Sequence, residues 1–353
     1  MTTTEVLVAA PNGTLLADLN VVPLASHIVN DVGDASFTMS LTDAKAKERF
    51  LQFGNVLIIN NDELPPWVGF IDSSLGRDWN GDSVTIRALS AEIIMNRRIV
   101  YPQQLAGTSG ALLRAMLNNL NAASEGGLKI YPGDIYMGGP THYYPIIGRC
   151  RDVMDRIAKR GGKCDWSITH KIIDGKVKLF ANLYKGERGV KTGRVLDYRN
   201  TELIAPLYTE DGEIWNHVVF MKPLDESGEV KICDPQRDEK SIGLYGLHMY
   251  LGEANAEEEE GLIWMARAWL YDHAYPRGMC APTILNLDSV FKTVRLGNIY
   301  RWENHSVGFE NGYIGTGDEV RMTGFEVDYA TDKVRATVES TTKPFDIMTL
   351  FNQ

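Results

Sequence analysis

The residues best suited to chemistry in this sequence are its seven histidines. Imidazole nitrogens bind transition metals and move protons near neutral pH, but a metal site needs several ligands that converge. The histidines lie far apart, and none belongs to a His-Glu-x-x-His or similar motif. They are His27, His142, His170, His217, His248, His273 and His305. We therefore predict no metal site and interpret each histidine as a packed or surface side chain.

Three glycine-containing segments resemble parts of known motifs but lack the context that those motifs need. Residues 315–317 (GTG) precede an expected strand, whereas a dinucleotide phosphate binds at the N-terminus of a helix. Residues 189–192 (GVKT) have a valine between the glycine and the lysine and follow no apolar strand, unlike a phosphate-binding loop. Residues 107–110 (GTSG) lack the spacing of a nucleophile elbow, and we interpret them as a loop and helix cap.

Acidic and thiol side chains give no better candidate. Four consecutive glutamates at residues 257–260 would point in different directions on a helix, whereas calcium needs convergent oxygens, so we interpret them as a helix first turn. Carboxylates that cleave glycosides are paired by the fold and cannot be recognised in a sequence. The cysteines include no Cys-x-x-Cys pair, which favours reduced, mostly buried thiols; they are Cys150, Cys164, Cys233 and Cys280. We predict no catalytic, cofactor-binding or metal-binding residue, no cofactor and no enzymatic activity, and instead a structural or interaction role.

Length and charge limit the function further. The chain has 353 residues, more than the ~250 that one compact core reaches, so two or three domains are expected. The net charge of −10 has the wrong sign for coating nucleic acid. Residues 149–199 hold 14 basic and 6 acidic residues, or +8, which leaves 22 basic and 40 acidic residues, or −18, elsewhere. This asymmetry favours a separate module with its own neighbour, or a solvated basic surface with no partner.

Neither a membrane-spanning segment nor an export signal is expected. No apolar run approaches the ~18–20 residues that span a bilayer. The N-terminus lacks the basic and apolar regions of a signal peptide.

Short strands are expected over the first hundred residues. Residues 56–59, 67–71 and 83–89 are apolar or alternating, and Asn80-Gly81 suits the two positive-φ positions of a type I′ hairpin turn. This block is typical of an antiparallel barrel or sandwich.

Helices and a second strand block are expected further along the chain. Apolar residues recur at helical spacing after a cap at Thr108 or Ser109 and again over residues 149–160. A hairpin that turns at Asp174-Gly175 completes a small α+β module. The remaining expected elements are a strand at 214–220, the longest helix at 254–273, strands at 320–327 and 334–338, and a tail from 341.

The order of these elements resembles the central hub proteins of phage tails, and most closely the tail-tip hub of long-tailed, non-contractile phages, which shares its fold with the baseplate hubs of contractile phages. Each matching segment is weak alone, and their order and spacing carry the resemblance. They are residues 15–19 (LLADL), 35–41 (ASFTMSL), 53–59 (FGNVLII), 66–72 (PWVGFID), 84–88 (VTIRA), 152–158 (DVMDRIA), 164–168 (CDWSI), 214–219 (IWNHVV) and 317–322 (GDEVRM).

The resemblance implies a β-rich α+β fold with two small β-barrels of the tail-tube type, an inserted α+β domain and a long helix before the second barrel. The implied segments are a first barrel at 1–100 plus 205–236, a basic inserted domain at 101–204, a connector with the long helix at 237–275, a second barrel at 276–340 and a tail at 341–353.

The implied function is structural. A homotrimer with six related barrels would adapt a sixfold tail tube to threefold tip components. Its partners would be the distal tail protein, tail tube and tape measure protein above, and tip fibre or spike proteins below. Viral DNA would pass through the lumen without specific binding. The protein would lie at the distal tip of the phage tail in the virion, after assembly in the host cytoplasm. Because the chain ends at Gln353, soon after the second barrel, no additional enzymatic domain is expected.

Three alternatives stay open at this point. The first is a sixfold distal-tail ring or another baseplate component. The second is the hub of a contractile injection system. The third belongs to a different class, a tail-borne cell-wall hydrolase or polysaccharide depolymerase.

Overall fold

The structure is a computed structural model that divides into two compact units. Unit 1 consists of Met1–Ile204, Pro282–Tyr300 and Arg321–Thr337, and unit 2 of Ala205–Ala281, Arg301–Val320 and Val338–Gln353. The structure describes residues 3–122, 127–139, 141–160, 164–202, 209–211, 214–222, 231–253, 259–275, 277–286, 290–304, 314 and 317–341.

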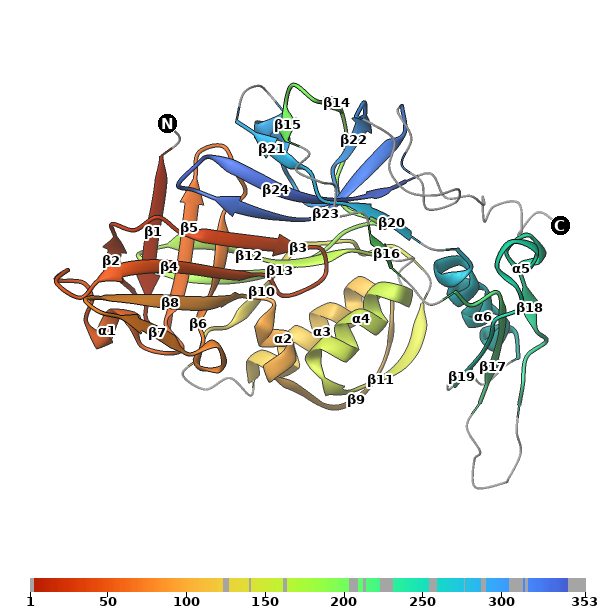
Figure 1. The fold of residues 1–353 in the computed structure, drawn as a ribbon. Helices are drawn as coiled ribbons and strands as arrows, with labels where there is room; N and C mark the ends of the chain where they lie inside the picture. Colours follow the sequence, from red (N-terminus) through yellow and green to blue (C-terminus); the bar gives the residue numbers. More distant parts are fainter. Residues whose placement is uncertain are drawn as a thin grey trace. The chain divides into compact units, whose positions relative to one another are not determined.

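Unit 1 begins with a block of antiparallel strands (Figure 1). Its elements are β1 (Thr4–Ala9), β2 (Leu15–Leu19), β3 (Leu24–Ile28), β4 (Asp34–Ser40), α1 (Glu48–Leu51), β5 (Val56–Asn61), β6 (Trp67–Ile71), the 3-10 helix η1 (Ser73–Leu75), β7 (Arg77–Asn80) and β8 (Ser83–Ser90). The strand order is β3-β4-β8-β6-β5-β1-β2, and β7 pairs with β8. Val84, Ile86 and Ala88 are buried, and this period of two is the one that the sequence predicted.

The predicted hairpin at Asn80-Gly81 is present, but its turn is displaced by one residue. Asn80 pairs with Ser83, so the turn consists of Gly81 and Asp82. Gly81 has a φ of 59°, whereas Asn80 belongs to the strand. Glycine in the first position is the pattern of a II′ turn rather than of the expected I′ turn. The pairing of β7 with β8 explains why the turn differs from the expected one. Shifting this pairing by one residue would turn Val84 to the opposite face of the sheet.

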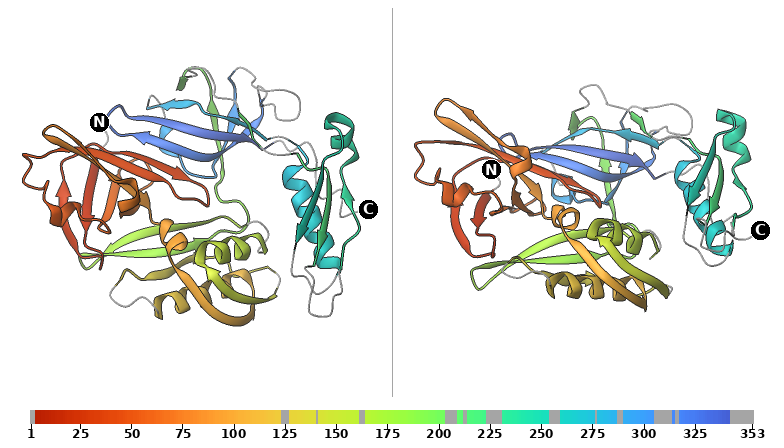
Figure 2. Two further views of the ribbon diagram at one scale, coloured as in Figure 1. Left: turned by 60° about the horizontal axis from the view of Figure 1, so that its bottom comes forward. Right: turned by 90° about the horizontal axis from the view of Figure 1, so that it is seen from below.

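The α+β module follows in unit 1. Its elements are α2 (Ile93–Arg97), β9 (Ile99–Gly107), α3 (Ser109–Ala122), β10 (Ile130–Ile135), β11 (His142–Arg149), α4 (Cys150–Arg160), β12 (Trp166–Ile173) and β13 (Lys176–Leu183). Helices α3 and α4 lie between the sheet β10-β13-β12 and the ribbon of β9 and β11 (Figures 1 and 2).

Local sequence patterns explain this module, and both predicted helices are confirmed. The apolar stripe of α3 is buried, and it comprises Leu112, Leu113, Met116, Leu117 and Leu120. The hydroxyl of Thr108 caps α3 by accepting the amide of Ala111 at 3.4 Å. Asp174 and Gly175 have φ values of 52° and 69° and form the predicted turn between β12 and β13.

A second strand block is built from distant segments. Its elements are β14 (Lys191–Leu196), β15 (Thr201–Glu202), β21 (Thr283–Leu285), the 3-10 helix η2 (Phe291–Thr293), β22 (Ile299–Trp302), β23 (Glu319–Asp328) and β24 (Lys333–Ser340). β14 pairs with β22 and β15 pairs with β21, so the end of the expected insertion contributes strands to this block. The expected strands at 320–327 and 334–338 are present as β23 and β24, and Asp332 in the turn between them has a φ of 50°.

The β-rich α+β class is confirmed, but 16 of the described strands form one large antiparallel sheet and not two closed barrels. The blocks join where β23 pairs with β3, from Gly324 opposite Ile28 to Asp328 opposite Leu24. β3 pairs with β4 on its other side, so β23 occupies the edge through which a separate first barrel would close. This pairing satisfies backbone groups that an open strand edge would expose.

Unit 2 contains a small sheet with a helix on one face. Its elements are β17 (His217–Met221), β18 (Gln236–Arg237), α5 (Glu239–Tyr245), β19 (Met249–Glu253) and α6 (Glu259–His273), and the unit also contains the antiparallel pair β16 (Thr209–Asp211) and β20 (Arg277–Cys280). The strand order is β18-β17-β19, with β17 and β19 parallel. β17 was expected to complete the first barrel, yet it pairs here with β18 and β19.

A buried asparagine and an aromatic stack account for this arrangement in unit 2. Asn216 is fully buried; its side-chain amide donates to the carbonyl of Gly246 at 2.7 Å, and its oxygen accepts the amide of His248 at 2.8 Å. These bonds hold the start of β17 beside the segment that leads into β19. Tyr250 of β19 stacks on Trp269 of α6, with 4.4 Å between ring centroids. The predicted long helix is confirmed from Glu259 to His273, and its expected start at 254–258 lies outside the described residues.

Candidate assembly surfaces

The described histidines lie apart from one another, and His248 is exposed whereas the others are at least partly buried. His27 stacks on Phe325 with 4.5 Å between ring centroids, and burial lowers its pKa to about 3. Burial also lowers the pKa of His170 to about 4. Among the described residues, no group of three or more histidine, cysteine, aspartate or glutamate side chains is arranged to hold a metal ion. The side chain of His142 and all of His305 lie outside the described residues.

The glycine segments serve the backbone. Gly189 and Gly297 have φ values of 103° and 83° and approach so closely that a Cβ on Gly189 would lie 2.2 Å from the carbonyl carbon of Gly297. The hydroxyl of Thr192 then donates to the carbonyl of Ile299 at 2.9 Å, so residues 189–192 bring β14 against β22. Ser109 donates to the carbonyl of Ile157 at 2.8 Å and ties α3 to α4. Of residues 315–317, only Gly317 is described, in a turn with a φ of 95°.

All four cysteines are free and buried, as the sequence predicted. Burial raises the pKa of the Cys150 thiol and of the Cys280 thiol to about 11. Such thiols are poor nucleophiles because little thiolate is present at neutral pH. Of the glutamate run, residues 257 and 258 lie outside the described part, and Glu259 and Glu260 form the exposed first turn of α6.

A buried ionic junction joins three segments of unit 1. Asp165, at the start of β12, is almost fully buried and receives the amide nitrogen of Asn30 at 2.8 Å and the backbone amide of Arg188 at 2.7 Å. The guanidinium of Arg321, from β23, completes the set as an ion pair with Asp165. Because every donor converges on one carboxylate, the junction fixes the α+β module against both strand blocks.

Glu92 supports the same region of unit 1. Its carboxylate accepts the backbone amide of Ile168 at 3.0 Å. Burial raises its pKa, while the hydrogen bonds from Ile168 and Ser90 oppose that rise. Neither this carboxylate nor Asp165 lines the described pocket, so we assign both a structural role.

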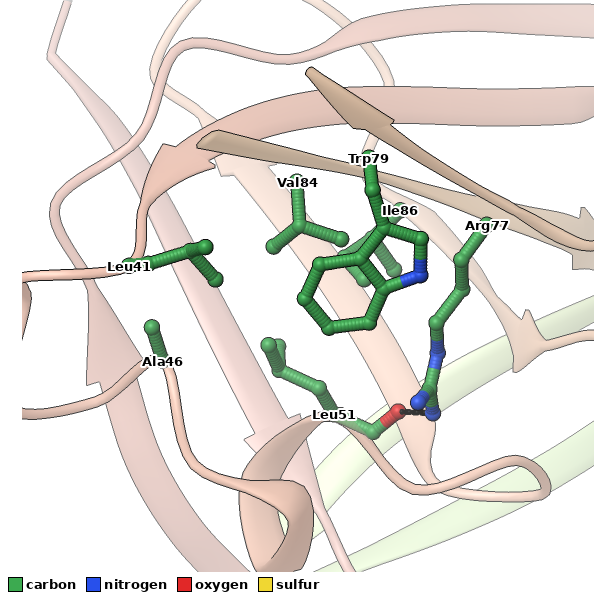
Figure 3. Close-up of a pocket in the computed structure, with 7 residues that line it drawn as sticks. All are labelled: Leu41, Ala46, Leu51, Arg77, Trp79, Val84 and Ile86. Atoms are coloured by element: carbon green, nitrogen blue, oxygen red, sulfur yellow. Dashed lines mark hydrogen bonds between the residues drawn. The ribbon is translucent and has the colours of Figure 1, made fainter. Parts of the chain in front are cut away.

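An apolar pocket of about 210 Å³ lies at the surface of unit 1 (Figure 3). The β7–β8 hairpin and the segment that ends in α1 supply its walls, which are formed by Leu41, Ala46, Leu51, Arg77, Trp79, Val84 and Ile86. Figure 3 shows the Trp79 indole lying across the pocket in front of Ile86. The indole is 64% exposed, although tryptophan normally buries most of its surface.

The lining suits a protein side chain better than a substrate. Small-molecule sites measure roughly 300–1,000 Å³ and hold several convergent polar groups. Here Arg77 is the one charged lining residue. Its guanidinium donates to the carbonyl of Leu51 and lies over the Phe53 ring, 4.2 Å from the ring centroid. Its Nε is buried and has no hydrogen-bond acceptor among the described residues.

Unit 2 exposes large apolar side chains on both of its layers. Trp264 and Met265 of α6 are 58% and 42% exposed, and Met249 and Leu251 of the edge strand β19 are 58% and 61% exposed. Exposed apolar groups gathered on one element mark protein contacts more often than isolated ones do. An edge strand beside them also offers backbone groups to another chain.

Sequence reasoning did not identify the pocket. Its residues come from four elements or loops between positions 41 and 86, and only the fold brings them together. One signal was available, because Trp79 stands beside the Gly81 turn in a polar strand, where an aromatic side chain has no core to enter.

None of the described helices is both long and apolar enough to cross a membrane.

No protein-family model and no curated protein sequence matches this chain. Solved structures do. The prophage tail protein gp18 from Listeria monocytogenes EGD-e aligns with a TM-score of 0.57 at 12% identity, over 99% of this chain and 98% of its own. The 43 kDa tail protein of prophage MuSo2 from Shewanella oneidensis aligns with a TM-score of 0.62 at 11% identity, over 96% and 98%.

A third structure, the tail protein from Neisseria meningitidis MC58, aligns with a TM-score of 0.60 at 10% identity, over 96% of this chain and 97% of its own. At these identities the likeness is one of fold. The chain therefore has the fold of phage tail proteins along almost its whole length, and the resemblance expected from the sequence is confirmed at that level.

Proposed function

We propose that this protein is a structural component of a phage tail and forms the hub at its distal end. The observation that carries the proposal is the fold shared with three tail proteins, two of them from prophages, which covers at least 96% of this chain and 97% of each of theirs. Because both chains of each pair are matched nearly end to end, the likeness is not confined to one common domain.

The hub function requires a closed ring of identical chains. In this proposal three chains associate, and the two strand blocks of each supply six related tube-type domains. Such a ring would join a sixfold tube to threefold tip components. Rings of identical chains need two different, complementary surfaces on each chain. Each chain has two different surfaces with exposed apolar residues, one around Trp79 of unit 1 and one on α6 and β19 of unit 2.

The proposal extends to partners, location and chemistry. The ring would contact the distal tail protein, tail tube and tape measure protein on one side and fibre or spike proteins on the other, at the tail tip of the virion. DNA would pass through an acidic lumen that repels its phosphates, in line with the net charge of −10. The protein would act without catalysis or a cofactor.

Stoichiometry is the sharpest test. Native mass spectrometry or mass photometry at low salt should find three 39.4 kDa chains, or about 118 kDa. Antibodies against the chain should label tail tips in electron micrographs. A sixfold assembly would instead support the distal-tail ring. Zymography of the purified protein on host cell walls should show no clearing, and clearing that disappears on changing one carboxylate would overturn the structural proposal in favour of a hydrolase.

A further inference from the structure

We propose that the exposed face of the sheet β10-β13-β12 binds the acidic start of α6 from a second copy of the same chain. The inference rests on the proposed ring of identical chains and names one of its contacts. The register of the three strands, the charges on their exposed face and the glutamates of α6 support it.

Helices α3 and α4 cover only one face of this sheet (Figure 2). Ile168, Leu179 and Ala181 belong to the buried core that these helices line. Because side chains alternate along a strand, the residues between them lie on the opposite face. We call this face the lysine face, and it consists of Lys129, Tyr131, Thr169, Lys171, Lys178 and Phe180.

Three lysines lie side by side across the strands. Lys171 of β12 is directly opposite Lys178 of β13. Lys129 comes one position before Ile130, which pairs with Leu179, and this register places Lys129 beside Lys178. Lys129 and Lys171 are exposed, and Lys178 is half-buried. Like charges directly opposite each other destabilise a pair of strands, so carboxylates of a partner would remove a repulsion that the isolated chain bears.

Two aromatic rings hold these ammonium groups in place. The Nζ of Lys171 lies 5.3 Å from the centroid of the Phe180 ring, and the Nζ of Lys178 lies 5.9 Å from that of the Tyr131 ring. Cations that are positioned before a partner arrives lose less freedom on binding. The same lysines cover ring faces on which a nucleobase would stack, which favours a protein partner over single-stranded nucleic acid.

No acidic residue belongs to the lysine face. Over residues 129–135 and 166–183 the sequence has four lysines and two aspartates. Asp174 lies in the turn between β12 and β13, and the backbone amide of Asp134 donates to Asn182 at the other end of β13. None of the three lysines of the face forms an ion pair with a described residue. The face is therefore positive and open to an acidic partner.

The start of α6 supplies the opposite charge. Glu259 and Glu260 are exposed in its first turn, and neither forms an ion pair with a described residue. They end the longest acidic run of the sequence, residues 257–260. Outside residues 149–199 the chain has 22 basic and 40 acidic residues, or −18, so a second copy is a partner that the lysine face attracts. The two surfaces differ, which lets each copy bind two neighbours head to tail.

Zero-length cross-linking tests the contact. Isotope-labelled and unlabelled wild-type chains are mixed, allowed to assemble and treated with a carbodiimide, which joins a lysine amine directly to a carboxylate. Mass spectrometry should find Lys171 or Lys178 joined to Glu259 or Glu260, with labelled peptides joined to unlabelled ones. The matched control is Lys171→Arg combined with Lys178→Arg, which keeps both charges but cannot form the amide. It should assemble normally and give no such pairs.

Charge reversal supplies a second measurement. Lys171→Glu combined with Lys178→Glu should raise the dissociation constant of the assembly at least ~10-fold, because attraction is replaced by repulsion. Lys47→Glu combined with Arg49→Glu makes the same change in net charge at exposed cations near α1 and should have a smaller effect.

A charge swap identifies the partner residues. Glu259→Lys combined with Glu260→Lys should weaken assembly as much as the reversal of Lys171 and Lys178 does. A chain with all four substitutions should recover most of the affinity, and a chain that assembles no better than either double variant would overturn the inference.

The outcomes separate this inference from the proposed function. If the wild type is trimeric but gives no cross-linked pairs, and the reversal of Lys171 and Lys178 leaves assembly unchanged, the contact is wrong and the hub proposal stands. Pairs that never join labelled to unlabelled peptides would place the contact within one copy and overturn the inference. Binding of a fluorescent single-stranded oligonucleotide that the reversal abolishes, with assembly intact, would assign the face to nucleic acid instead. A wild-type chain that stays monomeric at every concentration would contradict the ring itself.

Discussion

At the scale of single residues, His27 makes the stability of unit 1 depend on pH. Its ring lies against Phe325, its Nε2 is buried without a partner among the described residues, and its folded pKa is about 3 against an unfolded value of 6.5. Because the folded pKa is the lower one, the unfolded chain binds more protons than the folded chain. The contribution of His27 to the stability of the fold is therefore complete above pH 6.5 and is lost as the pH falls towards 3. Because the ring is only half-buried, we expect the free energy of unfolding to fall by ~1–2 kcal/mol between pH 7 and pH 5.

Urea unfolding at several pH values measures this effect. His27→Phe keeps the ring contact with Phe325 and removes the titrating group, so its free energy of unfolding should fall less steeply below pH 6.5. Equal slopes for the wild type and this variant would show that the pKa of His27 is the same in the folded and unfolded chain.

The ion pair of Arg321 and Asp165 is a second feature at this scale. Both side chains are less than a tenth exposed, so Arg321→Ala leaves a buried carboxylate without its counter-ion. We expect a loss of about 3–5 kcal/mol in the free energy of unfolding. Lys45→Ala breaks the exposed pair with Asp18 and should cost less than ~1 kcal/mol. The double variant Arg321→Met, Asp165→Asn should be less destabilised than Arg321→Ala. A greater loss of unfolding free energy in the double variant would show that the unpaired charge of Asp165 does not limit the stability.

At the scale of elements, the contact between β14 and β22 depends on paired glycines. Gly297 has a φ of 83°, and a Cβ there would lie 2.0 Å from the carbonyl oxygen of Arg188. Gly297→Ala therefore combines backbone strain with a clash against the main chain and should cost more than ~2 kcal/mol. Gly76 has a φ of 66° with open space around it, so Gly76→Ala should cost only ~1 kcal/mol. Similar melting temperatures for Gly297→Ala and Gly76→Ala would show that β14 and β22 separate easily.

Local patterns predict the elements far better than their partners. The stripe of α3 and the turn at Asp174 depend on neighbouring residues, and both are found as predicted. By contrast, β23 pairs with β3 across about three hundred positions, and no periodicity in either strand specifies that partner. The same reason hides Asp165 and Arg321 from the sequence, since they are 156 residues apart. The sequence did not reveal the pocket, because the pocket is formed by the way the fold brings its lining residues together and not by the types of those residues.

At the scale of the whole molecule, charge and unit structure support the same proposal. The basic excess of residues 149–199 lies in the α+β module and β14 of unit 1, and the remainder of the chain is acidic. A chain with blocks of opposite charge can recognise a copy of itself head to tail. Assembly should therefore weaken as salt is raised, and mass photometry from 50 to 500 mM sodium chloride checks this. Salt-independent assembly would assign the contact to apolar residues alone.

Because each unit has its own core, a change in one core should leave the other unit intact. Leu262 is fully buried in the cluster that α6 forms with β17, and Leu262→Ala should destabilise unit 2 by about 2–5 kcal/mol. Hydrogen exchange followed by mass spectrometry should then show faster exchange in peptides from β17, β19 and α6 and unchanged exchange in those from α3 and β12. Leu117→Ala, in the core of unit 1, is the matched variant and should give the reverse pattern. Faster exchange throughout the chain in either variant would mean that the two units unfold together.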